Sequence, residues 1–469
     1  MHVPRIAAGK NLSFWPMGHI FRKSGAFFIR RSFRGAKLYT AVFERYIKAL
    51  LEEGHPLEFF IEGGRSRSGK LILPKLGFLS ILLQAQKEGF SEDLIFVPAS
   101  ITYDRILEEK AYLKELSGGK KEKESFRQFM KARHFLSRKY GRIYIRFGQP
   151  LSLNEYLARH EVPREEAAQE LAFHLIKSIN KATLVTPLAL IATAVLTKHR
   201  RGFYEKELMG TAEILLRFLK NHGIPMSAAL EPLDKAVGET ISYLIKNRVM
   251  NILEDIGGEE IFYYVEEEKK PELEYYKNSI IHCFIPHAFV ALSLLRGKEE
   301  VVPEQQILSD YAFMKNLFKN EFIFEEMPDI QEEVSKLTRF FQDADYIERD
   351  TANGGYRVTR IGFEELPIWA ALPKTFIESY WIAAQAFIRK GDKSLKQEDL
   401  LKNMNYLGLR YHKLGLIEHR ESINQLSFKN ALRYIQKEVT EVREISPDSS
   451  REKLSRLGER LYELSHYRF

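Results

Sequence analysis

The first third of the chain alternates short apolar runs with longer segments whose apolar positions recur at helical spacing. Four apolar runs predict strands, at Ala26–Ile29, Leu57–Ile61, Leu94–Thr102 and Arg142–Gly148. The segments between them predict helices, at Leu38–Glu53, Leu76–Glu88 and Glu124–Tyr140. Strands that alternate with helices predict an α/β layer, in which a mostly parallel sheet is flanked by helices.

After about residue 165 the pattern changes to long amphipathic helices, such as Glu165–Lys181, Lys206–Asn221 and Ala236–Asp255. We therefore expect an α/β domain over residues 1–165 and a mainly α-helical domain over residues 166–469. Within the second domain, Asn353 and Gly354 lie between alternating segments and predict a hairpin at Tyr346–Arg360. With the helix before it, this hairpin resembles a winged-helix fragment, but a purely structural hairpin is the favoured interpretation.

Basic residues are concentrated near the N-terminus. Residues 1–150 contain 28 Lys and Arg against 14 Asp and Glu, a net charge of +14, whereas the rest of the chain carries −6. No acidic residue precedes Glu44, against eight basic ones. A basic face of this kind suits nucleic acid, anionic lipid or a phosphorylated substrate, and charge alone does not choose among them.

A single cysteine, Cys283, excludes an internal disulfide framework and a cysteine-based zinc site. We expect no signal peptide, because the first residues contain no long apolar core. The two most apolar segments, Ala182–Thr197 and Ile280–Leu295, have 16 residues each and contain a proline. A membrane span needs about 20 apolar residues, so we expect core or interfacial helices at both places.

The segment F-F-I-E-G-G-R-S-R-S-G-K, Phe59–Lys70, raises the question of a phosphate-binding loop. Gly64–Lys70 fits G-x-x-x-x-G-K, but Leu71 stands where a nucleotide-binding P-loop needs Ser or Thr for magnesium. Leu71–Pro74 is also unsuited to a helix that begins at once, as a P-loop requires. Two glycines and two arginines after an apolar strand nevertheless indicate a loop that binds an anion. The favoured anion is not the phosphate group of ATP.

Three loops are expected to meet beyond the carboxyl ends of the strands, where open parallel sheets bind ligands. The expected site residues are Arg30, Arg31 and Lys37 in the first loop, Glu62, Gly63, Gly64, Arg65, Ser66 and Arg67 in the second, and Pro98 and Tyr103 in the third. Guanidinium groups suit phosphate because two parallel N–H donors can meet two oxygens. Neighbouring residues of an extended segment point to opposite sides, so one of Arg30 and Arg31 is expected to face the ligand. Glu62 either accepts hydrogen bonds from a hydroxylated substrate or braces Arg65.

At these residues the chain resembles the glycerol-3-phosphate acyltransferase family, of the bacterial PlsB type and its mitochondrial relatives. That family has four ordered motif blocks. Three of them match here: Gly25–Arg31 the second, Phe60–Gly69 the third and Val97–Arg105 the fourth. The likeness is strong over residues 1–157 and continues more weakly towards the C-terminus.

The resemblance implies a glycerol-3-phosphate 1-O-acyltransferase, which moves a fatty acyl group from acyl-ACP or acyl-CoA to sn-glycerol 3-phosphate in the first step of phospholipid synthesis. It implies that the phosphate is held by Arg31, Lys37, Arg65 and Arg67. It also implies that Glu62 and Gly63 shape the glycerol site, and that Pro98 and the loop after it border the acyl donor. No metal or cofactor is implied. With the basic N-terminal part, we expect peripheral attachment to the anionic cytoplasmic face of the cell membrane.

The family's first block, H-x-x-x-x-D, does not occur in the sequence. Acyl transfer to an alcohol needs a base for the hydroxyl proton, and a His oriented by an Asp suits that role. None of the thirteen His has Asp five positions later; His160 has Glu165 there. We therefore expect an N-terminally shortened and poorly active chain, without a catalytic residue of its own. The alternatives are a non-catalytic phosphate-binding relative and a basic nucleic-acid-binding protein. No nucleic-acid partner is expected, because no basic motif interleaved with aromatic residues occurs.

Overall fold

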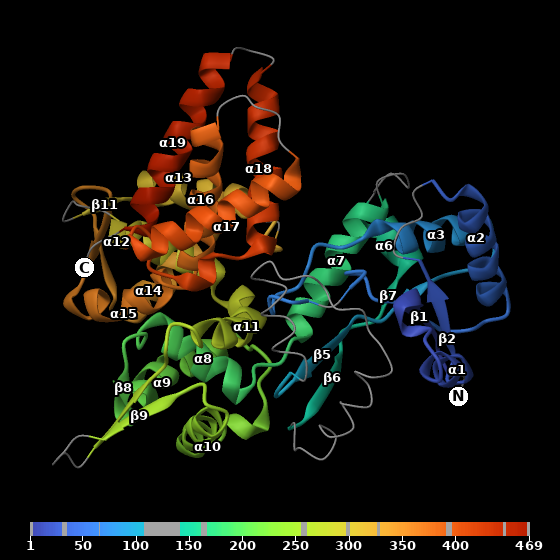
Figure 1. Ribbon diagram of the computed structural model, residues 1–469, viewed down its shortest axis with the longest axis horizontal. Helices are drawn as coiled ribbons and strands as arrows, with labels where there is room; N and C mark the ends of the chain where they lie inside the picture. The colour runs from blue at the N-terminus through green and yellow to red at the C-terminus, as the bar shows by residue number, and fades with distance from the viewer. Residues whose placement is uncertain are drawn as a thin grey trace. The chain divides into compact units, whose positions relative to one another are not determined.

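The computed structural model describes residues 3–30, 35–64, 66–106, 141–160, 167–254, 260–296, 301–325, 329–390, 396–443 and 447–466. These residues form two compact units, with unit 1 in blue to teal and most of unit 2 in green to red (Figure 1). Unit 1 holds the described residues up to Ser66 and from Leu71 to Thr183. Unit 2 holds Arg67–Lys70 and the described residues from Leu184 onward. Four residues of the glycine-rich loop therefore belong to unit 2.

Unit 1 is built on a parallel sheet with the strand order β2–β1–β3. Its strands are β1 (Arg5–Gly9), β2 (Ala26–Ile29) and β3 (Leu57–Glu58). Two antiparallel pairs join β4 (Ile95–Phe96) to β7 (Leu151–Ser152), and β5 (Ala99–Tyr103) to β6 (Ile143–Phe147). The described helices of the unit are η1 (Lys10–Leu12), α1 (Met17–Lys23), α2 (Lys37–Glu52), α3 (Leu76–Lys87), α6 (Leu153–His160) and α7 (Ala167–Ala182).

Aromatic packing connects α2 and α3 to the parallel sheet. α2 buries Phe43, Ile47 and Leu50, whose spacing places them on one face of the helix. The ring of Phe43 lies 6.3 Å from that of Phe27 on β2 and 5.9 Å from that of Phe78 on α3. Burial of each such side chain contributes about 1.5–3 kcal/mol. This packing fixes the end of β2 and the start of α2, which enclose the first predicted site loop.

The predicted α/β layer is confirmed for the parallel sheet with α2 and α3, but two strand predictions need correction. The sequence predicts one strand over Leu94–Thr102, whereas β4 and β5 are separate, since Pro98 between them has no backbone N–H to donate. β6 was expected in the parallel sheet, but it pairs antiparallel with β5, with Ile145 opposite Ile101. The predicted helix Glu124–Tyr140 lies outside the described residues.

Unit 2 is mainly helical, as the sequence predicts. Its described helices are α8 (Pro187–Thr197), α9 (Glu205–Asn221), η2 (Ala228–Leu230), α10 (Leu233–Lys246), α11 (Lys270–Ile280), η3 (Ile281–Cys283), α12 (Ile285–Arg296), α13 (Glu304–Leu317), α14 (Ile330–Asp343), α15 (Arg360–Ala370), α16 (Lys374–Lys390), α17 (Gln397–Lys413), η4 (Arg420–Ser422), α18 (Gln425–Arg443) and α19 (Pro447–Ser465). The predicted helix Ala236–Asp255 is wrong at its end, because the helix stops at Lys246 and a strand follows.

Two small antiparallel sheets accompany these helices. One has the order β8–β10–β9, from β8 (Phe203–Tyr204), β9 (Asn251–Glu254) and β10 (Ile261–Tyr264). The other has the order β11–β13–β12, from β11 (Val302–Pro303), β12 (Ile347–Asp350) and β13 (Gly355–Val358). β12 and β13 confirm the predicted hairpin. Tyr356 of this hairpin is buried, and its hydroxyl lies 3.4 Å from Oγ1 of Thr338 on α14. The hairpin is thus part of the core, which agrees with the structural interpretation.

The two apolar segments singled out in the sequence form buried helices of unit 2. Every residue from Leu188 to Leu196 on α8 is buried, and ten residues of α12 are buried. No single helix in the described ranges has the length and apolar composition to cross a membrane. The helices Lys270–Cys283 and Ile285–Arg296 have this length and composition only when taken together, and the pair is bent by 93° at the break between them. The sequence predicts core or interfacial helices at both places, and the burial of their side chains in unit 2 agrees with core helices.

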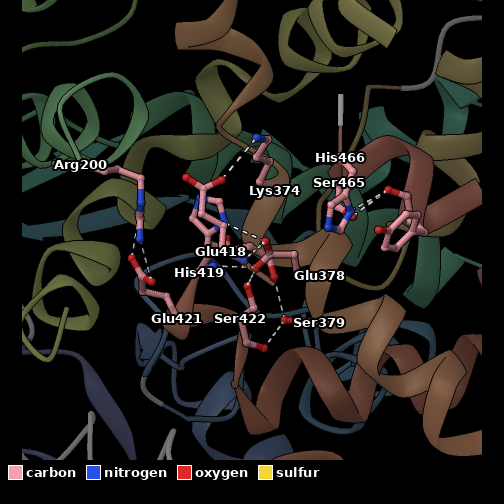
Figure 2. A network of polar contacts seen from close by, with 12 residues as sticks. Arg200, Lys374, Glu378, Ser379, Glu418, His419, Glu421, Ser422, Ser465 and His466 are labelled. Carbon is pink, nitrogen blue, oxygen red and sulfur yellow. Dashed lines mark hydrogen bonds and ion pairs between the residues drawn. The ribbon is translucent and has the colours of Figure 1, made fainter. Parts of the chain in front are cut away.

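Unit 2 also contains a buried polar network (Figure 2). The carboxylate of Glu378 on α16 accepts hydrogen bonds from the backbone N–H groups of Glu418 and His419, at 2.9 and 3.1 Å. It also accepts from Nδ1 of His419 at 3.0 Å and from Oγ of Ser422 at 2.5 Å. These bonds stabilise η4 and the residues before it against α16.

Candidate functional site

Three chain segments leave the parallel sheet of unit 1 at its carboxyl edge, one after each of β1, β2 and β3. The register pairs Gly9 with Ile29 and Ile6 with Glu58. Lys10 follows β1 and Arg30 follows β2 directly, while Glu62 lies in a turn four residues past the end of β3. The structure therefore brings the start of the first predicted loop and the start of the second to the same edge.

Arg30 is held in place by an aromatic residue of α2. Its backbone N–H donates to the hydroxyl of Tyr39 at 3.1 Å, and its guanidinium lies 4.7 Å from the centre of the same ring. Lys37, the first residue of α2, is exposed. The first turn of α2 contains no acidic residue and no side chain caps it, so the partial positive charge of the helix terminus adds to these cations. Arg31 lies outside the described residues.

Glu62, in the segment after β3, has a largely buried carboxyl group. Burial raises its pKa to about 7, although the hydrogen bond that its Oε2 accepts from the N–H of Ile72, at 2.9 Å, acts in the opposite direction. A carboxyl with this pKa is present in both forms near neutral pH. It can therefore accept a hydrogen bond from a substrate hydroxyl in one form and donate one in the other.

The two glycines after Glu62 differ in their surroundings. Gly63 has φ +62°, and a Cβ built on it would lie 2.5 Å from Cδ of Lys75. Gly64 has no positive φ and open space where a Cβ would be. The positive φ therefore favours glycine at position 63, and a Cβ there would also displace the end of the Lys75 side chain, while neither applies to Gly64. Arg65 lies outside the described residues.

The rest of the glycine-rich loop changes unit. Ser66 is the last residue of its segment in unit 1, and Arg67 begins the segment that packs with unit 2. The lysine of the G-x-x-x-x-G-K match, Lys70, is buried and forms an ion pair with Glu321. No helix follows it at once, because α3 begins at Leu76. A P-loop lysine has to reach a nucleotide phosphate, so the structure agrees with the rejection of an ATP-binding loop.

Pro98 and Tyr103 flank an exposed apolar face. The carbonyl of Pro98 accepts a hydrogen bond from the N–H of Gly148 at 2.7 Å. Tyr103 is opposite Ile143 in the antiparallel pair β5–β6. Alternate residues of a strand share a face, and the face that carries Tyr103 contains the exposed side chains of Ile101, Tyr103, Ile143, Ile145 and Phe147. Such a face suits an apolar ligand.

Three neighbours of the site were missed by sequence reasoning. Lys10 follows β1, whose short sequence R-I-A-A-G gives little strand signal although it is the central strand. Tyr39 contacts Arg30, nine positions before it, and Lys75 lies close to Gly63, twelve positions before it. The periodicity of the sequence does not reveal such contacts. Within the described ranges, His, Cys, Asp and Glu side chains form no group of three or more that is arranged to hold a metal ion.

Comparison with known proteins identifies the family. Residues 112–440 match a family model described as the glycerol-3-phosphate acyltransferase C-terminal region, and residues 2–102 match one described as acyltransferase. A protein named glycerol-3-phosphate acyltransferase from Pasteurella multocida (strain Pm70) is 30% identical over 441 residues, which cover 91% of this chain and 53% of the relative.

Two further proteins of that name show the same relationship. The one from Aeromonas hydrophila subsp. hydrophila is 34% identical over 393 residues, or 81% of this chain and 48% of the relative. The one from Alteromonas mediterranea is 36% identical over 314 residues, or 64% of this chain and 38% of the relative. The chain spans about half the length of the curated relatives it matches. Because the model of the C-terminal region matches more than half of the chain, the chain belongs to the glycerol-3-phosphate acyltransferase family.

Proposed function

We propose that this chain binds glycerol 3-phosphate and an acyl thioester as part of a glycerol-3-phosphate 1-O-acyltransferase. The observation that most supports the proposal is the carboxyl edge of the parallel sheet, because the segments that carry Arg30 and the half-neutral carboxyl of Glu62 both follow strands that end there. A polyol phosphate needs both kinds of group, because its phosphate calls for cations and its hydroxyls call for hydrogen-bonding partners.

The proposed reaction forms a bond between the 1-oxygen of glycerol 3-phosphate and the acyl carbonyl carbon. The bond from that carbon to the thioester sulfur breaks, a base takes the hydroxyl proton and passes it to the sulfur, and acyl carrier protein or coenzyme A leaves as the thiol. The phosphate-holding role is assigned by resemblance to Arg31, Lys37, Arg65 and Arg67. Glu62 and Gly63 take the glycerol, and the apolar face near Pro98 and Tyr103 takes the acyl donor.

Binding and turnover are expected to differ for this chain on its own. No His in the sequence has Asp five positions later, and a well-placed general base contributes about 10²–10⁴-fold in rate. We therefore propose that the 469-residue chain binds glycerol 3-phosphate but transfers acyl groups poorly.

A membrane surface is the proposed site of action. Unit 1 exposes Trp15 at 80% and Leu38 at 79%, and basic residues outnumber acidic ones in the first third of the chain. Exposed apolar side chains beside basic ones suit the interface of an anionic bilayer. Recruitment to phosphatidylglycerol vesicles that weakens at high salt supports this part; equal binding to neutral vesicles contradicts it.

The substrate proposal is tested by calorimetric titration of the 469-residue chain with glycerol 3-phosphate, inorganic phosphate and glycerol. We expect glycerol 3-phosphate to bind most tightly, since it alone engages both the cations and Glu62. The variant Lys37→Ala should weaken binding, whereas Lys23→Ala, an exposed lysine of α1 in the same unit, should not. Equal affinity for inorganic phosphate and glycerol 3-phosphate would overturn the assigned substrate.

A further inference from the structure

The segment Arg67–Lys70 follows the proposed phosphate loop in the chain, yet it packs as part of unit 2. Its last residue, Lys70, is only 8% exposed. The ammonium group forms an ion pair with the carboxylate of Glu321 and donates to the backbone carbonyl of the same residue at 3.0 Å. The ring centres of Phe322 and Phe376 lie 5.0 and 4.8 Å from the ammonium nitrogen. Lys70 is therefore enclosed by unit 2.

The residue before it brings the backbone of the segment against α11. Gly69 has φ +93°, and a Cβ built on it would overlap the carbonyl oxygen of Tyr275 and lie 3.1 Å from the backbone nitrogen of Ser279. Ser68 is 4% exposed. Three consecutive residues are thus fixed in unit 2, by burial, by backbone approach and by an ion pair.

The ion pair defines the position of the Lys70 ammonium group more than it stabilises the fold. Removing two charges from water offsets most of their attraction, so a buried pair is often no more stable than an apolar pair of similar size. Glu321, however, gives the ammonium group one defined partner. Burial lowers the pKa of Lys70 to about 7, so loss of the carboxylate would remove the ion-pair partner of an ammonium group whose charge burial already disfavours.

We propose that Lys70 and Glu321 are positioning residues for the glycerol-3-phosphate site. Burial of Ser68 and Lys70 in unit 2 also restricts the backbone of the same segment at Arg67, which the resemblance assigns to the phosphate. Arg67 is three residues from Lys70, so their Cα atoms stay within about 11 Å of each other. The inference rests on the proposed function. Linkage makes it reciprocal: a ligand held by the loop strengthens the docking of the segment as much as docking strengthens the affinity for the ligand.

The test measures the dissociation constant of glycerol 3-phosphate by calorimetry for the 469-residue chain and its variants. Glu321→Gln keeps the size of the side chain but removes the charge, and we expect binding about 5- to 50-fold weaker. The double variant Lys70→Met with Glu321→Leu replaces the pair by apolar groups that can keep the segment docked, and should return the affinity close to that of the wild type. If Lys70 instead contacts the phosphate itself, the double variant loses as much affinity as the single one, and the positioning role is overturned.

Glu333→Gln is the matched control, because Glu333 is also buried in unit 2 and pairs with Lys315 at 2.6 Å. It should lower stability without changing the dissociation constant. Hydrogen exchange of the peptide over residues 62–70 supplies a second readout, which should accelerate in Glu321→Gln and not in Glu333→Gln. Unchanged exchange and affinity in Glu321→Gln overturn the inference. A wild-type chain that binds no glycerol 3-phosphate overturns the proposed function and the positioning role with it, while the exchange still decides whether the pair holds the segment.

Discussion

The side chains of Glu378 and His419 meet at 3.0 Å in unit 2, where neither is more than 3% exposed. Burial alone would raise the pKa of Glu378, but His419 and the other donors outweigh it and hold the pKa below its usual value. The carboxylate is therefore ionised, and Nδ1 of His419 donates to it. A buried anion with four donors is a demanding arrangement, because each donor loses its partner if the charge is removed.

Glu378→Gln is expected to lower the free energy of unfolding by about 2–4 kcal/mol. The amide group brings two donors to a place where Glu418, His419 and Ser422 already donate, so at least one pair of donors must face each other. Urea unfolding at pH 7 measures the change. Glu452→Gln, which alters an exposed carboxylate paired with Arg456, should change the same quantity by less than about 1 kcal/mol. Equal effects of the two variants would contradict the role given to the network.

Arg200 and Glu421 form a second buried pair in Figure 2, joined by bonds of 2.9 and 3.2 Å. Arg200→Met should cost about 3–5 kcal/mol, because it leaves the carboxylate buried without its guanidinium partner. Arg200→Met with Glu421→Leu should recover most of the loss. Urea unfolding of both variants checks the difference, and a double variant as unstable as the single one would argue that the pair itself is needed.

The same pair predicts a dependence on pH. Burial would raise the pKa of Glu421, but the charge and hydrogen bonds of Arg200 hold it at about 2. The folded pKa lies below the unfolded one, so this contribution to stability is complete above about pH 4.5 and is lost as the pH falls towards 2. The free energy of unfolding should therefore fall less steeply between pH 5 and 3 in the double variant than in the wild type.

The sequence predicted the strands and helices that have a strong local pattern. β2, α2 and α3 lie where apolar periodicity placed them, because β2 is a distinct apolar run and each helix buries apolar residues on one face. β1 was missed because its five residues are mostly small, and its place in the centre of the sheet is decided by pairing with β2 and β3. The antiparallel pairing of β6 with β5 likewise cannot be inferred from the local sequence pattern of either strand.

The candidate site was predictable in part for the same reason. Arg30 and Glu62 follow apolar runs, so their position beyond strand ends could be inferred from the sequence. The contact between Lys75 and Gly63 could not, because the chain returns to the loop after twelve residues. The ion pair of Lys70 could not be inferred either, since its partner Glu321 is 251 residues away in the chain. Long-range ion pairs of this kind leave no signal in a single sequence.

Glu62→Gln is predicted to flatten part of the dependence of stability on pH. The folded pKa of Glu62 is raised to about 7, so its contribution is complete below about pH 4.5 and is lost as the pH rises through 7. At about 1.4 kcal/mol for each pKa unit, the upper limit of this loss is about 3 kcal/mol. Urea unfolding at pH 5 and pH 8 should show a smaller difference in the variant. Glu58→Gln, at an exposed position on β3, should leave the difference as in the wild type.

Gly63 and Gly64 are adjacent in the loop, and their alanine variants should behave differently. Gly63→Ala places a Cβ at a residue with φ +62°, 2.5 Å from Cδ of Lys75. Strain of that kind costs about 1–3 kcal/mol, so the loop should shift, and the affinity for glycerol 3-phosphate should fall together with stability. Gly64→Ala meets open space without a positive φ, so stability should stay the same or rise slightly, because alanine restricts the unfolded chain. Thermal unfolding and calorimetric titration of both variants measure the two effects. A loss of affinity in Gly64→Ala with unchanged stability would mean that the ligand itself approaches that backbone closely. Unchanged stability and affinity in Gly63→Ala would refute the conformation assigned to the loop.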